Sequence, residues 1–277
     1  FINPIVKINE SGMPIGKIKD NDTVICFNFR TDRCRQITSV LTQSDMPELD
    51  MKTIDVHFTT MTNYDKKFKN IHIIYNKENI KNTIGEVIAN NGLSQIRISE
   101  TEKYPHVTFF LSGGKEEKFK NEKRILIPSP KVATYDLLPE MSARSVTSRI
   151  VDEIHKQKSD FICLNFANTD MVGHTGNYNA ILKAIETIDD CAKKVIESCI
   201  KNNYACLIIS DHGNADISKN SDGSPNTAHT TNPVPCFLIN SGYDNIENGK
   251  LCDVAPTILH IMGIETPEQM TGKTLIK

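Results

Sequence analysis

Short apolar runs alternate with helical patterns along most of the chain, and this alternation limits the possible folds most strongly. From about residue 80 onward the runs are continuous and rich in branched residues, as in strands buried on both faces. The longest helical pattern, 177–203, places Ile181, Ile185 and Ile188 at helical spacing. Strands joined by helices of this length favour parallel pairing. The sequence therefore predicts an α/β fold, with a mostly parallel sheet and helices on both of its faces.

The expected elements form two groups of different texture. The first group is strand-rich, with strands at 23–30, 55–62 and 71–75 and a helix at 32–43. The second alternates regularly, with strands at 94–100, 106–114, 160–168, 204–210 and 234–240 and helices at 80–92, 140–157, 177–203 and 253–263. Because the texture changes after Tyr75, we expect two domains, residues 1–75 and 76–277.

Composition argues against several classes of protein. The 277 residues carry a net charge of only −2, which gives no bulk attraction to nucleic acid or to a membrane surface. No apolar run approaches the roughly 20 residues of a membrane span. The eight cysteines show no C-x-x-C spacing, which favours reduced thiols over a disulfide framework. We expect a cytoplasmic protein without nucleic-acid or membrane partners.

Aspartate and histidine residues gather beside three of the expected strands. In open α/β sheets, ligand-binding groups collect past the carboxyl ends of the strands. Asp and His together are common ligands of Zn²⁺, Mn²⁺ or Mg²⁺, and a two-metal site can clamp the oxygens of a phosphoryl transfer. The sequence therefore predicts a metal site formed by Asp170, His174, Asp211, His212 and His229.

Each of these polar groups also has an ordinary structural alternative. Asp211 could cap a turn while His212 faces solvent, and Asp216 is interpreted as a turn residue. The remaining histidines are expected to be packed or surface residues without a role in the site: His57, His72, His106, His155 and His260.

The segments around the predicted metal site carry a recognisable pattern. NFANTDMVGHTG (165–176), ISDHGNAD (209–216) and TAHTTNPVP (227–235) resemble, in this order, the metal-binding motifs of the alkaline phosphatase superfamily. More narrowly, they resemble those of the cofactor-independent phosphoglycerate mutases. Three segments without a metal ligand are similar to the same family, so that the resemblance covers nearly the whole chain: FNFRTDRCRQI (27–37), TEKYPHVTFFLSGG (101–114) and IPSPKVATYDLLPEMSA (127–143).

This resemblance implies an enzyme that interconverts 3-phosphoglycerate and 2-phosphoglycerate in glycolysis and gluconeogenesis. The family uses a phosphoserine intermediate and two metal ions, Mn²⁺ or Mg²⁺. The resemblance implies that Asp170, His174 and His229 hold one ion, and that Asp211 and His212 supply part of the other site. The full enzyme is expected to be a monomer whose partner is the small-molecule phosphoglycerate substrate.

The resemblance also implies a division of labour between two domains. Residues 1–75 correspond to the end of an inserted phosphotransferase domain, and residues 76–277 to an alkaline-phosphatase-like domain. Arg30 and Arg33 match substrate-binding arginines, and a guanidinium binds phosphate and carboxylate oxygens in bidentate fashion. Lys103 matches a lysine that contacts the phosphoryl group.

One part of the family pattern is missing from this sequence. The nucleophilic serine of the family lies in a segment of the type GNSEVGH, and no such segment occurs here, so no catalytic serine is assigned. The chain also opens on Phe1 in the middle of a pattern. We therefore expect a carboxyl-terminal portion of the enzyme, inactive alone. The alternatives are another phosphomutase or hydrolase of the superfamily, or a non-catalytic fragment that binds only a metal or a partner.

Overall fold

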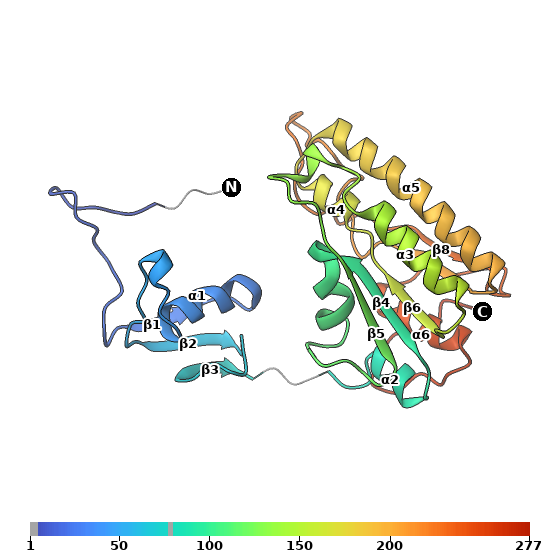
Figure 1. Cartoon of the computed structure of the whole chain (residues 1–277), viewed down its shortest axis with the longest axis horizontal. Coiled ribbons are helices and arrows are strands. Elements are labelled where there is room, and N and C mark those ends of the chain that lie inside the picture. The colour runs from blue at the N-terminus through green and yellow to red at the C-terminus, as the bar shows by residue number, and fades with distance from the viewer. Residues whose placement is uncertain (1–4, 77–79) are drawn as a thin grey trace. The chain divides into compact units, whose positions relative to one another are not determined.

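The computed structural model describes residues 5–76 and 80–277. The chain divides into two compact units, Phe1–Glu78 and Asn79–Lys277, called here the first and the second unit. Figure 1 shows the elements of both. Among the described residues, no helix combines the length and the apolarity that a membrane span requires.

The first unit is built on a parallel sheet in the order β1-β2-β3. Its strands are β1 (Thr23–Cys26), β2 (His57–Thr62) and β3 (Ile71–Tyr75), and the helix α1 (Asp32–Thr42) lies between β1 and β2 in the chain. Parallel neighbours need such a crossover connection. The sheet and α1 bury a small core whose members include Cys34, Thr38, Phe58, Met61 and Tyr64.

The first strand is shorter than expected. The amide of Asn28 bonds the carbonyl oxygen of Cys26 at 2.9 Å, and this tight turn ends β1. The hydroxyl of Tyr64 donates to the carbonyl oxygens of Cys26 and Asn28, which holds the turn in place. As a result Phe27 and Phe29 lie beyond the strand and are exposed.

The second unit contains two hydrogen-bonded sheets. The larger is parallel, in the order β5-β4-β6, with β4 (Gln95–Glu100) between β5 (Glu122–Ile127) and β6 (Phe161–Leu164). The smaller pairs β7 (Cys206–Ile209) with β8 (Cys236–Ile239) in antiparallel fashion. The prediction of a mostly parallel α/β fold is confirmed, and β8 is the exception. No helix lies between β7 and β8, so the chain returns in the opposite direction through a long loop.

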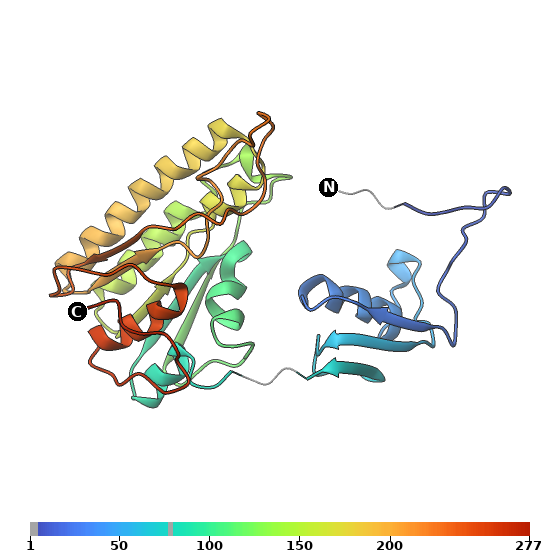
Figure 2. The ribbon, with the colours of Figure 1, turned by 180° about the vertical axis from the view of Figure 1, so that it is seen from behind.

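Helices cover both faces of the larger sheet, as expected (Figures 1 and 2). On one face Ile96 and Ile98 of β4 pack into a core with α3 (Ala143–His155) and α5 (Tyr178–Lys201). On the other face lie α2 (Ile84–Asn90) and α6 (Val254–Ile261), which share a second core that includes Ile84, Val87, Ile88 and Leu259. Alternate side chains of a strand point to opposite faces, and on the face of α2 the side-chain amide of Gln95 in β4 donates to the carbonyl oxygen of Gly85 at 2.8 Å.

The expected strand at 106–114 is wrong, because His106–Phe110 is a π-helical turn. The amide of Ser112 bonds the carbonyl oxygen of Thr108 at 3.0 Å, as in a helix. A proline precedes the turn, and Gly113 ends it with a φ of +69°. A short apolar run does not by itself separate a strand from a buried helical segment. The proline before this run and the glycines at its end were better indicators of a helical turn than the apolar residues were of a strand.

One strand was not expected at all. The strand β5 reads EKRILI, and its charged first half conceals it in the sequence. Those charges have partners: Lys123 pairs with Glu153 of α3 at 2.6 Å, and Arg124 pairs with Glu122 in the same strand. Short 3₁₀ turns lie at Pro47–Leu49, Thr101–Lys103, Tyr135–Leu137 and Leu251–Asp253.

Candidate metal centre

The candidate metal centre begins on a short helix that follows β6. The helix α4 spans Asn168–Gly173, with Asp170 in its first turn and His174 as its C-cap. The chain keeps helical geometry through His174, whose backbone lies in the right-handed helical region. Residues four apart lie on the same side of a helix, so Asp170 and His174 point in the same direction.

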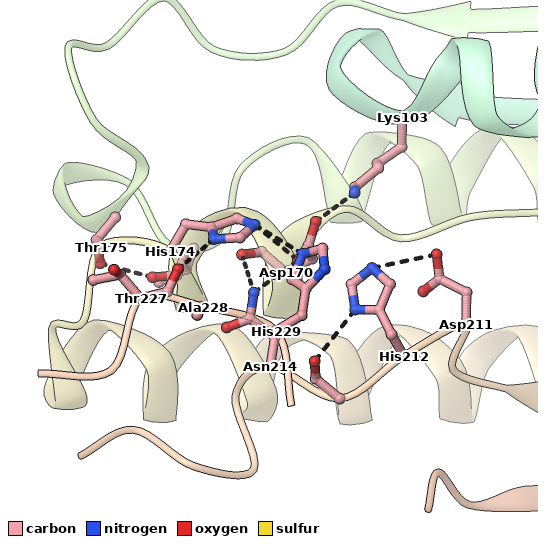
Figure 3. Close-up of polar contacts among 12 residues, drawn as sticks. Lys103, Asp170, His174, Thr175, Asp211, His212, Asn214, Thr227, Ala228 and His229 are labelled. Atoms are coloured by element: carbon pink, nitrogen blue, oxygen red, sulfur yellow. Dashed lines mark hydrogen bonds and ion pairs between the residues drawn. The ribbon is translucent and has the colours of Figure 1, made fainter. Parts of the chain in front are cut away.

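Three side chains meet at this place. The Nε2 atoms of His174 and His229 lie 3.2 and 3.1 Å from Oδ1 of Asp170, and 3.1 Å from each other (Figure 3). A tetrahedral ion with bonds of about 2.1 Å holds its ligand atoms roughly 3.4 Å apart. One carboxylate and two imidazoles in this spacing fit a divalent cation.

The loop that carries His229 also orients His174. Nδ1 of His174 lies 2.7 Å from the carbonyl oxygen of Thr227. A carbonyl oxygen can only accept a hydrogen bond, so Nδ1 holds the proton and Nε2 keeps its lone pair. Histidine ligands of metals are commonly oriented in this way. The pairing therefore prepares Nε2 of His174 as a ligand.

Two donors, Lys103 and Asn214, hold the carboxylate of Asp170. Lys103, at the end of a 3₁₀ turn that follows β4, forms an ion pair with Oδ2, and Asn214 donates to Oδ1 at 2.7 Å. Burial alone would raise the pKa of Asp170, but the hydrogen bonds from Lys103 and Asn214 outweigh it and lower the pKa to about 2. Asp170 is therefore ionised at neutral pH, as a metal ligand must be.

Asp211 and His212 lie beside this cluster rather than in it. The ring of His212 stacks on that of His229, with the two centroids 3.7 Å apart. Oδ2 of Asp211 lies 3.5 Å from Nε2 of His212, and the Asp211 side chain is 63% exposed. In Figure 3 both residues extend from the cluster on the side of His229. They come from the loop between β7 and β8, which also carries His229.

The two arginines singled out in the sequence belong to the first unit. Arg30 lies in the segment after β1, and its Nε pairs with Asp32 at 3.1 Å. Arg33 lies in the first turn of α1 and donates from Nη1 to Gln36 at 3.2 Å. Both side chains are exposed. The candidate metal centre and Lys103 belong to the second unit.

Sequence reasoning missed two residues of the site. Asn214 was not named, yet it bonds Asp170. Asp216, interpreted as a turn residue, accepts hydrogen bonds from Thr230 and Asn232 in the loop that carries His229. The sequence did indicate them in one way, since they follow the predicted ligand His212 by two and four residues. The histidines expected to have no role in the site do not join the described metal-ligand group: His57, His72, His106, His155 and His260.

Comparisons with known proteins show which family the chain is similar to. A family model described as the Metalloenzyme superfamily matches residues 12–266. A 2,3-bisphosphoglycerate-independent phosphoglycerate mutase of Flavobacterium johnsoniae is 53% identical over 276 residues, which are 100% of this chain and 55% of that protein. The protein of the same name from Bacteroides thetaiotaomicron is 56% identical over 279 residues, with the same coverage.

A solved structure is similar over almost the whole chain. The structure of Leishmania mexicana phosphoglycerate mutase at low cobalt concentration matches with a TM-score of 0.85 and 26% identity, covering 98% of this chain and 53% of that one. The chain thus spans about half the length of the curated relatives that it matches. The family match runs through both units and includes every residue of the candidate metal centre, and the chain belongs to the Metalloenzyme superfamily.

Proposed function

We propose that this chain forms the metal-binding portion of a phosphoglycerate mutase that interconverts 3-phosphoglycerate and 2-phosphoglycerate through a phosphoserine intermediate. The observation that carries the proposal is the meeting of Asp170, His174 and His229 within 4.8 Å of one another, in a chain that is 53% identical to a named mutase. The first unit would be the end of the phosphotransferase domain, and the second the phosphatase-like domain.

The metal-binding role belongs to the second unit. Asp170, His174 and His229 would hold one ion, and Asp211 with His212 would contribute to a second. Two imidazoles beside a carboxylate favour Mn²⁺ over Mg²⁺, since Mg²⁺ prefers oxygen ligands. When bound, the ions supply positive charge that stabilises the oxygens of a transferring phosphoryl group.

Three basic residues would bind and orient the substrate. Lys103 forms an ion pair with Asp170, so its ammonium is within reach of an anionic group beside the ion. Arg30 and Arg33 are exposed guanidinium groups with donors arranged for bidentate contact with carboxylate or phosphate. In the proposed reaction, Lys103 contacts the phosphoryl group, and Arg30 and Arg33 serve as substrate-binding arginines.

A chimaera tests the proposal directly. The amino-terminal part of the Flavobacterium johnsoniae mutase, joined to this chain, would supply the serine that the family pattern requires. With Mn²⁺ and 3-phosphoglycerate, the chimaera is expected to form 2-phosphoglycerate, and its H174A variant is expected to form none. The 277-residue chain alone is expected to show no turnover, because both steps of a covalent mechanism need the nucleophile.

The same assay separates the alternatives. Release of inorganic phosphate without 2-phosphoglycerate would favour a hydrolase of the superfamily. Binding of Mn²⁺ by a chimaera that folds but turns over no substrate would favour a non-catalytic fragment. Isomerisation by the chain alone would show that the nucleophile lies among its own serines.

We also propose that the protein acts as a monomer in the cytoplasm. All eight cysteines are free thiols, which suits a reducing compartment. Sedimentation of the purified chimaera at micromolar concentration tests the monomer, and a dimer would contradict it.

A further inference from the structure

We propose that residues 213–216, the sequence GNAD, are a clamp that fixes Asp170 and His229 relative to each other while supplying no ligand to their cluster. The proposal rests on the proposed metal site, because the clamp acts through the ligands. Asn214 reaches toward Asp170, and Asp216 reaches toward the loop of His229. The two side chains are two residues apart and form the two arms of the clamp.

The first arm holds Asp170. Nδ2 of Asn214 donates to Oδ1 of Asp170 at 2.7 Å and to its backbone carbonyl oxygen at 3.2 Å. Oδ1 is also the atom that both histidine Nε2 atoms approach, so Asn214 positions the shared corner of the cluster. Asn214 is only 6% exposed, and a buried hydrogen bond of this kind is difficult for water to replace.

The second arm holds the loop of His229. The hydroxyl of Thr230 donates to both carboxylate oxygens of Asp216, at 3.1 and 2.9 Å, and Asn232 donates to Oδ2 at 2.7 Å. The amide of Thr230 also bonds the carbonyl oxygen of Gly213 at 2.9 Å. Thr230 directly follows His229, so these contacts set where the His229 ring can lie.

Glycine is required on both sides of the clamp. A Cβ at Gly213 would lie 2.1 Å from Oγ1 of Thr230 and 2.8 Å from Oδ1 of Asp216. A Cβ at Gly173 in α4 would lie 2.3 Å from Oδ1 of Asn214. Both arms therefore close on positions where only a hydrogen fits. Such packing restricts the clamp to one arrangement of the two ligand-bearing segments.

The carboxylate of Asp216 is occupied by these hydrogen bonds, and Asp216 does not join the described metal-ligand group. It is a positioning residue, as is Asn214. Replacing the outer partners of metal ligands typically weakens metal binding about 10–100-fold. The buried Asn214 arm should lie toward the upper end of this range. The more exposed Asp216 arm should lie toward the lower end, since water can substitute for part of its contacts.

Titration calorimetry with Mn²⁺ on the 277-residue chain tests the clamp. The N214A variant should raise the Kd for Mn²⁺ toward about 100-fold, and D216A and T230V should raise it about 10-fold. T230S keeps the hydroxyl and should bind within about twofold of the parent chain. D222N is the matched control, because Asp222 of the same loop accepts its hydrogen bonds from the amide and the hydroxyl of Ser224, away from Thr230 and Asn232.

Melting temperatures separate positioning from a merely structural role. A positioning clamp predicts that Mn²⁺ raises the Tm of T230V less than that of T230S, while the metal-free Tm values of the two variants stay close. Equal losses of Tm with and without Mn²⁺ would overturn the clamp. So would Mn²⁺ binding within twofold of the parent in D216A and T230V, which remain informative if N214A fails to fold. Absence of Mn²⁺ binding by the parent chain would instead overturn the metal site itself, and the clamp with it.

Discussion

At the scale of single residues, the candidate metal centre depends on a glycine that no polar motif would single out. Gly173 of α4 faces the carboxamide of Asn214, and a Cβ there would lie 2.3 Å from Oδ1 and 2.8 Å from Cγ. Asn214 cannot move away without losing its bond to Asp170. G173A is therefore expected to lower the free energy of unfolding by about 1–3 kcal/mol, measured by urea denaturation. In the double variant G173A/N214A the clash is relieved, so it should be more stable than G173A. A G173A variant as stable as the parent would contradict the packing.

The ligands themselves give a second prediction at this scale. H174A and H229A should each abolish the rise in melting temperature that Mn²⁺ causes, because a ligand stabilises the native state only when its concentration is comparable to or above its Kd. H155A is the matched control, since His155 is an exposed histidine on α3. Thermal melts with and without the metal measure the difference. An undiminished Mn²⁺ effect in H174A would exclude that histidine from the site.

The metal ligands could be predicted from their residue types, whereas the residues that support them could not. Asp170, His174 and His229 attracted attention because carboxylates and imidazoles beside strand ends have a known chemistry, and they lie together in the structure. Asn214 drew none, because an amide in a turn is common and its bond to Asp170 spans 44 residues of chain. A hydrogen bond between residues far apart in the sequence leaves no pattern in either segment. Asp216 was interpreted as a turn residue for the same reason.

At the scale of elements, α3 is anchored to β5 through one buried carboxylate. Glu153 of α3 pairs with Lys123 of β5 at 2.6 Å and with Lys156 at 2.9 Å. Burial would raise the pKa of Glu153, but the hydrogen bonds from these two lysines hold it below its usual value. A lowered pKa in the folded state contributes stability above the unfolded pKa of about 4.3 and loses it as the pH falls through the folded value.

The lowered pKa of Glu153 determines how the E153Q variant should behave. The variant should unfold more easily than the parent at pH 7, and the difference should shrink as the pH falls below about 4.3. Urea denaturation between pH 7 and pH 3 measures it. E197Q changes an exposed glutamate of α5 and serves as the control. A difference between E153Q and the parent that is the same at both ends of this range would rule out the ion pairs as its cause.

Most elements followed from the sequence, the longest helix most closely, but one short run was assigned to the wrong type and one strand was not expected. The helix expected at 177–203 is α5, Tyr178–Lys201, because a pattern repeated over many turns averages out local exceptions. The run at 106–114 holds too few residues to show a hydrophobic period. It forms a π-helical turn between a proline and two glycines. The strand β5 was hidden by its charges, and the partner of Lys123, Glu153 of α3, comes beside it only in the folded unit.

At the scale of the whole molecule, the α/β class followed from the alternation of elements, whereas the pairing of the last strands did not. The direction of β8 depends on how residues 210–235 return to the sheet, and no local pattern encodes that. The same loop carries Asp211, His212 and His229. The part of the fold that was not predicted therefore carries three of the five residues expected at the metal site, while Asp170 and His174 lie on and directly after α4. Long loops between strands often have this role, since a rigid scaffold fixes their ends.

The division into two units leads to the last prediction. Arg30 and Arg33 belong to the first unit and the candidate metal ligands to the second, so substrate binding and metal binding should be separable. In the chimaera with the Flavobacterium johnsoniae segment, R30A and R33A should each lower kcat/KM about tenfold or more, the loss expected for hydrogen bonds from a charged group. R30K should also be impaired, because an ammonium lacks the planar pair of donors.

The affinity for Mn²⁺ should stay within about twofold of the parent in R30A, R33A and R30K. The control variant K52A changes an exposed lysine of the same unit, and it should leave both kcat/KM and the affinity for Mn²⁺ unchanged. A parallel loss of Mn²⁺ affinity would mean that the arginines act on the metal site rather than on the substrate, and unchanged kinetics would remove them from the substrate site altogether.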